Sequence, residues 1–419
     1  MAEQANADVV ASVHETRCCI VGGGPAGTIL SLLLARAGVP VTLLESHADF
    51  DRDFRGDTVH PSTLELFDKI GLSDKLHAIP HGKIRTFRLR TKDRAYDMAK
   101  LNRLHTKFPY VLTVAQSKML DLLVDEAKHY PNFRVVMQAN VQRLVEEGGT
   151  IKGVRYRDQT NQWHEVRAPL TVAADGRFSK LRHLIGVEPV KTSPPMDVVW
   201  FRLPKKPTDP SDAAEIFVGG SKFIVLLDRG DQWQLGFAIL KGSFAAIRTA
   251  GIEVMRQAVA TMIPWLADRV EHLHDWKDVA VLNVESSRVE KWYKPGLLLI
   301  GDAAHVMSPV GGVGINVAIQ DSIAVANLLT DPLLKGVVTE ADLEKVQKLR
   351  EPGVKGVQKF QTMLQGRLAG PGLTEQEFRV PWFIRLALSL PIIRNIPAKM
   401  IAFGPHRVRL KDRPPVARV

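Results

Sequence analysis

"CCIVGGGPAGTILSLLLARAGVPVTLLE" (residues 18–45) joins an apolar strand, a glycine-rich turn, a long apolar helix and a terminal acid. The helix repeats its leucines at helical spacing, and Gly38 followed by Pro40 ends it. A second apolar strand then runs over 41–45. Strand, helix and strand in this order predict a βαβ unit of a parallel sheet.

The glycines of this stretch follow the pattern G-x-G-x-x-G. The first permits a tight turn, the second lets a pyrophosphate approach the backbone, and the third lets helix and strand pack closely. Free amides at the helix start suit a diphosphate, and an acid at the end of the second strand suits a ribose diol. The predicted nucleotide-binding residues are Gly22, Gly24, Pro25, Ala26, Gly27 and Glu45. An acid at this position argues against a 2′-phosphate on that ribose, but it does not separate NAD from FAD.

Composition narrows the class of protein. A chain of 419 residues suits about two or three domains. The net charge of +11 is concentrated in 83–107 and the C-terminal tail, yet no nucleic-acid-binding motif accompanies either stretch, so we expect a solvated basic surface and no nucleic-acid partner. Cys18 and Cys19 are neighbours and exclude a disulfide framework.

The two ends of the sequence bear on the cellular location of the protein and on its contact with membranes. The N-terminus shows no signal-peptide pattern, so we expect a cytoplasmic protein. The apolar stretch 380–403 is interrupted by arginines and prolines and is too broken to span a membrane. Packing of this stretch against the body is favoured, and a weak membrane-surface contact through 380–419 is the alternative.

The pattern changes along the chain in a way that predicts an inserted domain. Long alternating strands fill 196–240, a helix is expected over 252–269, and 296–329 returns to a strand–loop–helix pattern. We therefore expect a discontinuous nucleotide-binding domain, a substrate-binding sheet domain and a basic helical tail. The expected ranges are 1–82, 108–190 and 280–365 for the first, 83–107 and 191–279 for the second, and 366–419 for the tail.

Two further motifs lie at the ends of apolar strands. "DGRFSKLR" (175–182) matches D-G-x-x-S-x-x-R and follows the strand "LTVAA". "IGDAAHVMSPVGGVGIN" (300–316) begins with Gly301–Asp302, directly after the strand "GLLLI". An acid beside so many glycines is not explained by a plain strand-to-helix loop.

With these three motifs in this order, the chain resembles the para-hydroxybenzoate-hydroxylase-like flavoprotein monooxygenases, the single-component aromatic hydroxylases. The resemblance covers nearly the whole chain. It implies an α/β fold, with a Rossmann-like FAD-binding domain of the GR2 type, an inserted antiparallel-sheet substrate domain and a helical C-terminal tail. It also implies bound FAD, transient docking of NADPH or NADH, and no metal.

The reaction that the resemblance implies is hydroxylation. O2 and reduced flavin would give a C4a-hydroperoxyflavin, which passes one oxygen to an aromatic or polyketide-like substrate. A small hydrophobic aromatic substrate and O2 are the expected partners, and the expected assembly is a monomer or a homodimer.

The resemblance also assigns site residues. Asp302 would bond ribityl or ribose hydroxyls, Asp175 would lie near the pyrophosphate, and Pro309 would lie close to the isoalloxazine ring. His60 is the other catalytic candidate, as a base or a hydrogen-bond donor, although a structural role at the helix start is favoured. The remaining expected FAD contacts are Arg55, Gly56, Gln116, Gly301, Gly312, Val313, Gly314, Ile315 and Asn316.

The substrate pocket is expected between the inserted sheet and the flavin. Its candidate lining residues are Phe217, Phe223, Val225, Trp233 and Phe237. Alternation along the strands places only some of them on one face. The apolar character of this block suggests a bulky, polyketide-like aromatic substrate.

Other flavin chemistry is less well supported by the sequence. A halogenase needs a W-x-W-x-I-P stretch and a disulfide reductase needs a second dinucleotide motif, and neither occurs. A reductase or epoxidase of the same fold, similar to geranylgeranyl reductases, stays open. A non-catalytic escort protein also stays open, although Asp302 and its glycine loop favour bound FAD.

Overall fold

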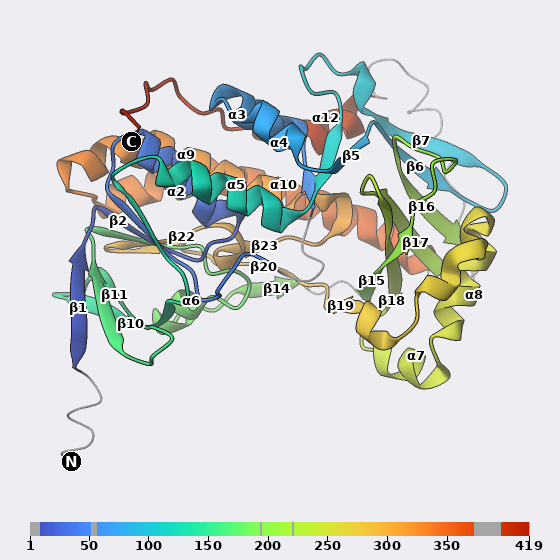
Figure 1. Ribbon diagram of the computed structural model, residues 1–419, viewed down its shortest axis with the longest axis horizontal. Coiled ribbons are helices and arrows are strands. Elements are labelled where there is room, and N and C mark those ends of the chain that lie inside the picture. The colour runs from blue at the N-terminus through green and yellow to red at the C-terminus, as the bar shows by residue number, and fades with distance from the viewer. Residues whose placement is uncertain (1–8, 52–56, 193–194, 220–221, 373–394, 419) are drawn as a thin grey trace.

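The computed structural model describes residues 9–51, 57–192, 195–219, 222–372 and 395–418. A six-stranded sheet forms the centre of one half of the molecule (Figure 1). Its order is β21-β22-β13-β2-β3-β9, and all its neighbours are parallel except β21 and β22. The strands are β21 (Tyr293–Lys294), β22 (Leu297–Leu299), β13 (Leu170–Ala173), β2 (Cys18–Val21), β3 (Val41–Leu44) and β9 (Phe133–Val136).

This sheet is covered on both faces, which explains why its strands are continuous apolar runs. One face carries α2, α5 and α9, with α10 packed on α9 (Figure 1). The other face carries the sheet β1-β12-β11-β10. The bounds are α2 (Pro25–Arg36), α5 (Gln116–Lys128), α9 (Gly314–Lys335), α10 (Glu340–Gly372), β1 (Val10–Glu15), β10 (Asn140–Glu147), β11 (Thr150–Arg157) and β12 (Trp163–Arg167).

The two adjacent cysteines, Cys18 and Cys19, lie in the core of the nucleotide domain. Both are free and fully buried on β2. Burial raises the pKa of Cys19 to about 12, so its thiol stays protonated and unreactive.

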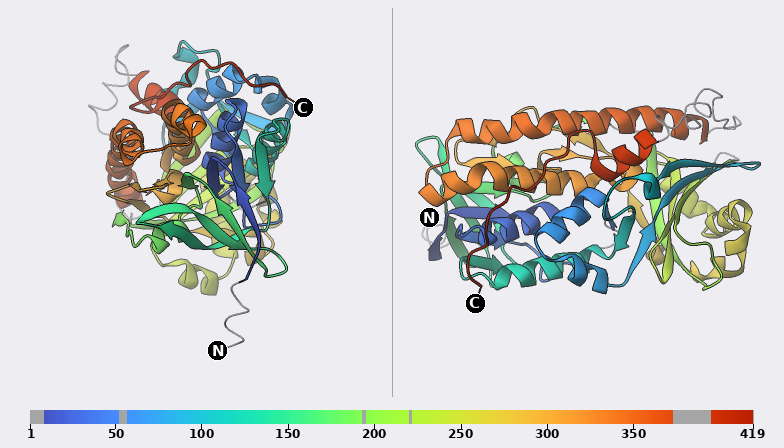
Figure 2. Two further views of the ribbon diagram at one scale, coloured as in Figure 1. Left: turned by 90° about the vertical axis from the view of Figure 1, so that its left-hand side faces the viewer. Right: turned by 90° about the horizontal axis from the view of Figure 1, so that it is seen from above.

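A seven-stranded sheet of order β19-β15-β18-β17-β16-β6-β7 forms the other half. Helices α7 (Phe244–Ala250) and α8 (Glu253–Met262) and the 3-10 helix η2 (Pro264–His272) lie on its outer side, so the sheet stands between them and the nucleotide domain (Figures 1 and 2). Strands from 83–107 and from 191–279 share this sheet, and β19 extends it slightly further. The strands are β6 (Thr86–Arg90), β7 (Ala95–Lys100), β15 (Met196–Pro204), β16 (Ala213–Gly219), β17 (Lys222–Asp228), β18 (Gln232–Leu240) and β19 (Ala280–Leu282).

Two small sheets and short helices join the halves. One sheet is β4-β8-β5 and the other is β14-β20-β23. These elements are β4 (Thr58–Val59), β5 (His81–Ile84), β8 (Val111–Val114), β14 (Val190–Thr192), β20 (Ser286–Arg288), β23 (His305–Val306), α3 (Pro61–Lys69), α4 (Ser73–Ala78), α6 (Lys180–Leu184) and α12 (Ile396–Phe403).

The register of the seven-stranded sheet divides the predicted pocket residues between its two faces. Phe217, Trp233 and Phe237 share the outer face, where they pack into one cluster with residues of α8 and η2. These three therefore belong to the core of the sheet domain, which corrects their prediction as pocket residues. Phe223 and Val225 lie on the opposite, inner face, together with Val198 and Trp200. Residues alternate between faces along a strand, and the sequence could not show which set faces inward.

The C-terminal region differs from the prediction in two ways. Helix α10 runs through the expected boundary at 365–366. The described tail has one further helix, α12, followed by an extended segment, 404–418, that lies along the nucleotide domain (Figure 2). Three tail arginines form ion pairs with that domain: Arg407 with Glu65, Arg413 with Asp331, and Arg418 with Glu126. Most of the stretch 380–403 lies outside the described residues, so its membrane contact stays a prediction.

One described segment, Val310–Lys335, is long and apolar enough to cross a membrane by composition alone. It contains α9, and 72% of its apolar window is buried inside the protein. Its hydrophobicity is therefore that of a helix enclosed between α2 and α10.

We expect the substitution Trp233→Ala to lower the free energy of unfolding by about 3–5 kcal/mol, because it leaves a large cavity on the outer face. The Trp233 ring is buried, and its centroid lies 5.4 Å from that of the Trp265 ring. Its Nε1 donates to Asp209 Oδ2 at 2.8 Å. Urea unfolding measures the change. Val254→Ala on α8, where the side chain is 43% exposed, is the control and changes it by about 0.5 kcal/mol or less. Equal stability of the two variants would contradict the outer-face assignment.

Candidate functional site

Four adjacent parallel strands bring the predicted binding residues to one edge of the central sheet. In the order β22, β13, β2 and β3, the strands lead into Gly301–Asp302, Asp175, the Gly22–Gly24 turn and Glu45. Because neighbouring parallel strands end on the same side, these groups form a row. Such a row suits an elongated ligand with a diphosphate in its middle.

The glycine turn after β2 has room for a ligand only where a pyrophosphate is expected. Gly22 has φ +105°, and a Cβ there would lie 2.4 Å from the Ala174 carbonyl oxygen. A Cβ on Gly27 would lie 1.9 Å from the Gly22 carbonyl oxygen. A Cβ on Gly24, by contrast, would meet no protein atom within 4 Å. Helix α2 has no side-chain cap at this end, so its first amides are available to an anion.

Glu45 is held in place at the end of β3. Its Oε2 accepts a hydrogen bond from Gly23 N at 2.8 Å, and its Oε1 accepts one from His47 N at 2.9 Å. The side chain thus ties the second strand to the glycine turn. A direct contact between Glu45 and a ribose stays a prediction.

Asp175 shapes its own loop. Its Oδ1 accepts from Ser179 Oγ, the N-cap of α6, at 2.5 Å, and its Oδ2 accepts from Leu181 N in the first turn of that helix at 3.0 Å. Burial raises the pKa of this carboxyl despite these bonds. Arg182 then crosses to the neighbouring loop and donates to the Ala303 carbonyl at 3.0 Å. The motif therefore braces the Gly301–Asp302 turn, and a direct contact between Asp175 and a pyrophosphate stays a prediction.

The second glycine turn leads into α9. Gly311 and Gly312 have φ of +81° and +62°, and Thr58 Oγ1 donates to the Gly312 carbonyl at 2.8 Å. Asn316 Oδ1 accepts from His60 N at 2.9 Å and from Thr63 Oγ1 at 2.8 Å. The predicted residues Pro309, Val313, Gly314 and Ile315 are half-buried around this turn. Helix α9 also lacks a side-chain cap, so its first amides can stabilise negative charge.

His60 is a bridge between segments, which corrects its assignment as a catalytic base. Its side chain is buried and Nδ1 lies 2.6 Å from the Ile401 carbonyl, to which it donates. Burial lowers the pKa of His60 to about 4, although the carbonyls of Ile401 and Gly312 favour the protonated form. This enclosed position fits the structural role at the start of α3, which the sequence also favours.

A polar cluster at the junction of the two halves was not found by sequence reasoning. Asp57 Oδ2 pairs with Arg229 Nη1 at 2.6 Å, and Arg229 Nη1 donates to Gln234 Oε1 at 3.0 Å. The predicted residue Gln116 joins this cluster through its backbone, which donates to Asp57 Oδ1 at 3.3 Å. Burial raises the pKa of Asp57 and lowers that of Arg229. Arg55 and Gly56 lie outside the described residues.

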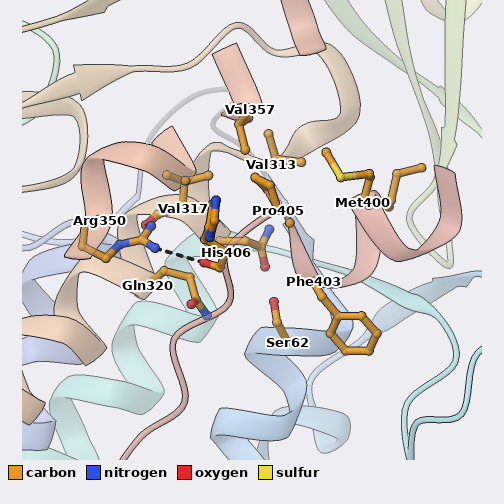
Figure 3. Close-up of a pocket in the computed structure, with 14 residues that line it drawn as sticks. Ser62, Val313, Val317, Gln320, Arg350, Val357, Met400, Phe403, Pro405 and His406 are labelled. Carbon is orange, nitrogen blue, oxygen red and sulfur yellow. Dashed lines mark hydrogen bonds between the residues drawn. The ribbon is translucent and has the colours of Figure 1, made fainter. Parts of the chain in front are cut away.

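A small cavity lies behind the α9 turn (Figure 3). Its volume is about 40 Å³, and Val313, Gln320, Arg350 and His406 are among its lining residues. This space suits about one ordered water molecule. It is far too small to hold an aromatic ring system with its substituents, so this cavity is not the expected substrate pocket.

Comparison with known proteins gives consistent matches. The FAD binding domain family matches residues 15–361. The chain is 31% identical over 400 residues to the 6-methylpretetramide 4-monooxygenase of Streptomyces rimosus, covering 95% of this chain and 94% of that protein. It is 24% identical over 334 residues to the squalene monooxygenase of Rattus norvegicus, covering 76% of this chain and 56% of that protein.

Two solved structures share the fold. The OxyS anhydrotetracycline hydroxylase of Streptomyces rimosus superposes with a TM-score of 0.72 at 23% identity, covering 93% of this chain and 76% of that chain. PqsL of Pseudomonas aeruginosa superposes with a TM-score of 0.73 at 17% identity, covering 87% and 98% of the two chains. The predicted fold class is confirmed.

We expect Gly24→Val to weaken FAD binding by at least about tenfold while leaving the fold intact. The new side chain would enter the space before the first amides of α2, where no protein atom lies within 4 Å. Since Gly24 precedes α2, the free energy of unfolding of the FAD-free protein should fall by only about 1 kcal/mol. FAD titration followed by flavin fluorescence measures the affinity.

Gly366→Ala is the matched control for this change. Gly366 lies in α10, and its Cβ would also meet no atom within 4 Å, so neither affinity nor fold should suffer. Unchanged FAD affinity in Gly24→Val would remove the glycine turn from the binding site.

We expect buried His60 to make the protein less stable as the pH falls from about 6.5 towards 4. Its pKa is about 4 in the folded protein and 6.5 in the unfolded chain, so the unfolded chain binds the extra proton in this window. The loss at pH 5 relative to pH 7 is about 2 kcal/mol. Urea unfolding of wild type and His60→Asn at both pH values isolates this contribution. An equal pH dependence in the two proteins would contradict it.

Proposed function

Because this chain belongs to the FAD binding domain family of flavoprotein monooxygenases, we propose that it hydroxylates a polycyclic aromatic substrate of polyketide type. The chain is an FAD-dependent monooxygenase that uses NAD(P)H and O2. The new part of this proposal is the class of substrate.

The observation that carries the proposal is the length of the likeness to 6-methylpretetramide 4-monooxygenase. It covers 95% of this chain and therefore includes the seven-stranded sheet as well as the nucleotide domain. The relative is named for its action on 6-methylpretetramide, a fused-ring compound. A likeness that extends through the sheet domain supports a substrate of similar size and chemistry.

The residues at the sheet edge fit FAD. The first amides of α2, behind Gly24, would hold the pyrophosphate, and Glu45 would hold a ribose. Asp302 follows β22 at the same edge, and the amides after Gly312 would face the isoalloxazine. The chemistry supplied by bound FAD is acceptance of a hydride from NAD(P)H and activation of O2.

The inner face of the seven-stranded sheet supports an aromatic substrate with a polar edge. Val198, Trp200, Phe223 and Val225 make one part of this face apolar. The cross-strand pair of Arg202 and Gln234 continues the same face with polar groups, next to the Asp57–Arg229 pair. An apolar surface that ends in cations suits fused rings that carry phenol or enol groups. These residues exclude water and orient the substrate.

The squalene monooxygenases suggest a second candidate, epoxidation of a hydrocarbon. Their likeness is weaker and covers a smaller share of this chain. The charged end of the inner face also has no counterpart in a pure hydrocarbon. Hydroxylation of a fused-ring phenol is therefore favoured.

We expect a fused-ring phenol such as anhydrotetracycline to accelerate NAD(P)H oxidation by the FAD-loaded protein by at least about tenfold over a monocyclic phenol such as 4-hydroxybenzoate. The apolar inner face gives the larger ring system more buried area. The product should carry one added oxygen, and mass spectrometry with isotopically labelled O2 shows whether that oxygen comes from O2.

Gly24→Val, which should bind FAD at least about tenfold more weakly, is the control with reduced activity at limiting FAD. Preferential turnover of 4-hydroxybenzoate would contradict the proposed substrate class. Oxygenation of squalene without oxygenation of any phenol would favour the second candidate.

A further inference from the structure

The side chain of Asp321 lies in the interior of the nucleotide domain, beneath the turn that carries Gly301 and Asp302. It projects from α9 and has no exposed surface. Its Oδ2 accepts from Gly301 N at 3.0 Å and from His305 Nε2 at 2.7 Å. Its Oδ1 accepts from Arg350 Nε at 2.8 Å. One buried carboxylate thus connects the turn, β23, α9 and α10.

The carboxylate is ionised in this setting. Burial alone would raise its pKa, but His305 and Arg350 outweigh burial and hold the pKa of Asp321 below its ordinary value. A buried charge is tolerated only when it is paired and hydrogen-bonded, and each oxygen here has a donor. The loss of any one donor therefore leaves charge uncompensated within the fold.

The turn above Asp321 has little freedom to relax. Gly301 has φ +57°, and a Cβ there would lie 3.3 Å from the Cβ atoms of both Ala26 and Ala318. The turn is thus enclosed between the first turns of α2 and α9. Since the expected FAD site would place the pyrophosphate at the start of α2 and the isoalloxazine at the start of α9, displacement of Gly301 would change both.

Arg350 carries the network further. Its Nη2 donates to the Val317 carbonyl in α9 at 3.3 Å. Its Nη1 donates to the carbonyl of His406, in the extended C-terminal segment, at 3.4 Å (Figure 3). The ring of Trp292 packs on that of His305, with centroids 4.9 Å apart. The position of Asp321 is therefore fixed from several sides.

We propose that Asp321 is a positioning residue of the FAD site: through Gly301 N it holds the Gly301–Asp302 turn, and the retention of FAD depends on it. The inference rests on FAD binding and not on the proposed substrate class. It therefore stands or falls separately from the polyketide assignment.

A buried ion pair in the other half of the molecule separates positioning from general stability. Asp209 and Arg269 lie 2.7 Å apart, and both side chains are 5% exposed. This pair lies beside η2, far from the nucleotide edge in the fold. Asp209→Asn therefore removes a comparable charge pair without touching the turn.

The experiment compares Asp321→Asn and Asp209→Asn as FAD-loaded proteins. FAD release is followed by the rise of free-flavin fluorescence after dilution, and thermal unfolding is measured in parallel. We expect release from Asp321→Asn to be at least about tenfold faster than from wild type, since an amide cannot replace a carboxylate facing these donors. Asp209→Asn should lower the thermal midpoint and release FAD at the wild-type rate. Equal release from both variants, whether fast or slow, would overturn the proposal.

A second pair of variants applies even if Asp321→Asn does not fold. His305→Gln keeps an N–H donor towards Asp321, whereas His305→Leu removes it. We expect His305→Leu to release FAD several-fold faster and to change the visible circular dichroism of the bound flavin, and His305→Gln to stay close to wild type. Identical release and spectra for the two variants would overturn the proposal. No substrate enters these measurements, so their outcome is independent of the hydroxylation assay.

Discussion

The parallel pairing of β22, β13, β2 and β3 is the constraint on which the nucleotide site depends. Hydrogen bonds between neighbours fix both the direction and the register of each strand. All four strands therefore end at one edge, and the loops that follow them deliver Gly301–Asp302, Asp175, the glycine turn and Glu45 side by side. A register shift of one residue would exchange the side chains that face the helices with those that face the second sheet, and it would displace the loop at the strand end.

The groups around this edge are held mainly by bonds within the protein. Arg182 reaches the loop after Gly301, Glu45 reaches the glycine turn, and Thr58 and Asn316 hold the start of α9. The Asp57–Arg229 pair attaches the sheet domain at the same place. A site supported in this way is already shaped for its ligand, which limits the ordering that binding requires.

Sequence reasoning located the features that are local in the chain. The glycine turns, Glu45 and the strand before Asp302 could be predicted because each follows from a few consecutive residues. The roles of Asp321 and Arg350 could not be predicted, because they depend on contacts between α9, α10 and a turn that is distant in sequence. Strand β1 was not predicted, because it is short and its partner β12 lies far along the chain.

The sheet domain shows a different limit. Its strands were predicted well, but alternation leaves two equivalent choices of inner face. Phe217, Trp233 and Phe237 were assigned to the wrong one, whereas Phe223 and Val225 lie on the inner face. Trp200 also lies on the inner face and was not predicted. Its ring packs closely over Gly236, where a Cβ would lie 2.8 Å from the ring. The helices α7 and α8 cover one face of the sheet and thereby decide which face is the outer one. The sequence of the strands carries no signal for the position of these helices.

The strand order of the central sheet also has a consequence for how the chain acquires its structure. β2 pairs with β13, and β13 pairs with β22, so the three strands come from a span that runs from Cys18 to Leu299. The entire seven-stranded sheet is built from residues within that span. Contacts so distant in sequence make closure of the chain entropically costly and folding slow. A chain in which β2 and β3 paired before β13 arrived would expose the apolar edge of β2, and such a partly folded chain would be prone to aggregate.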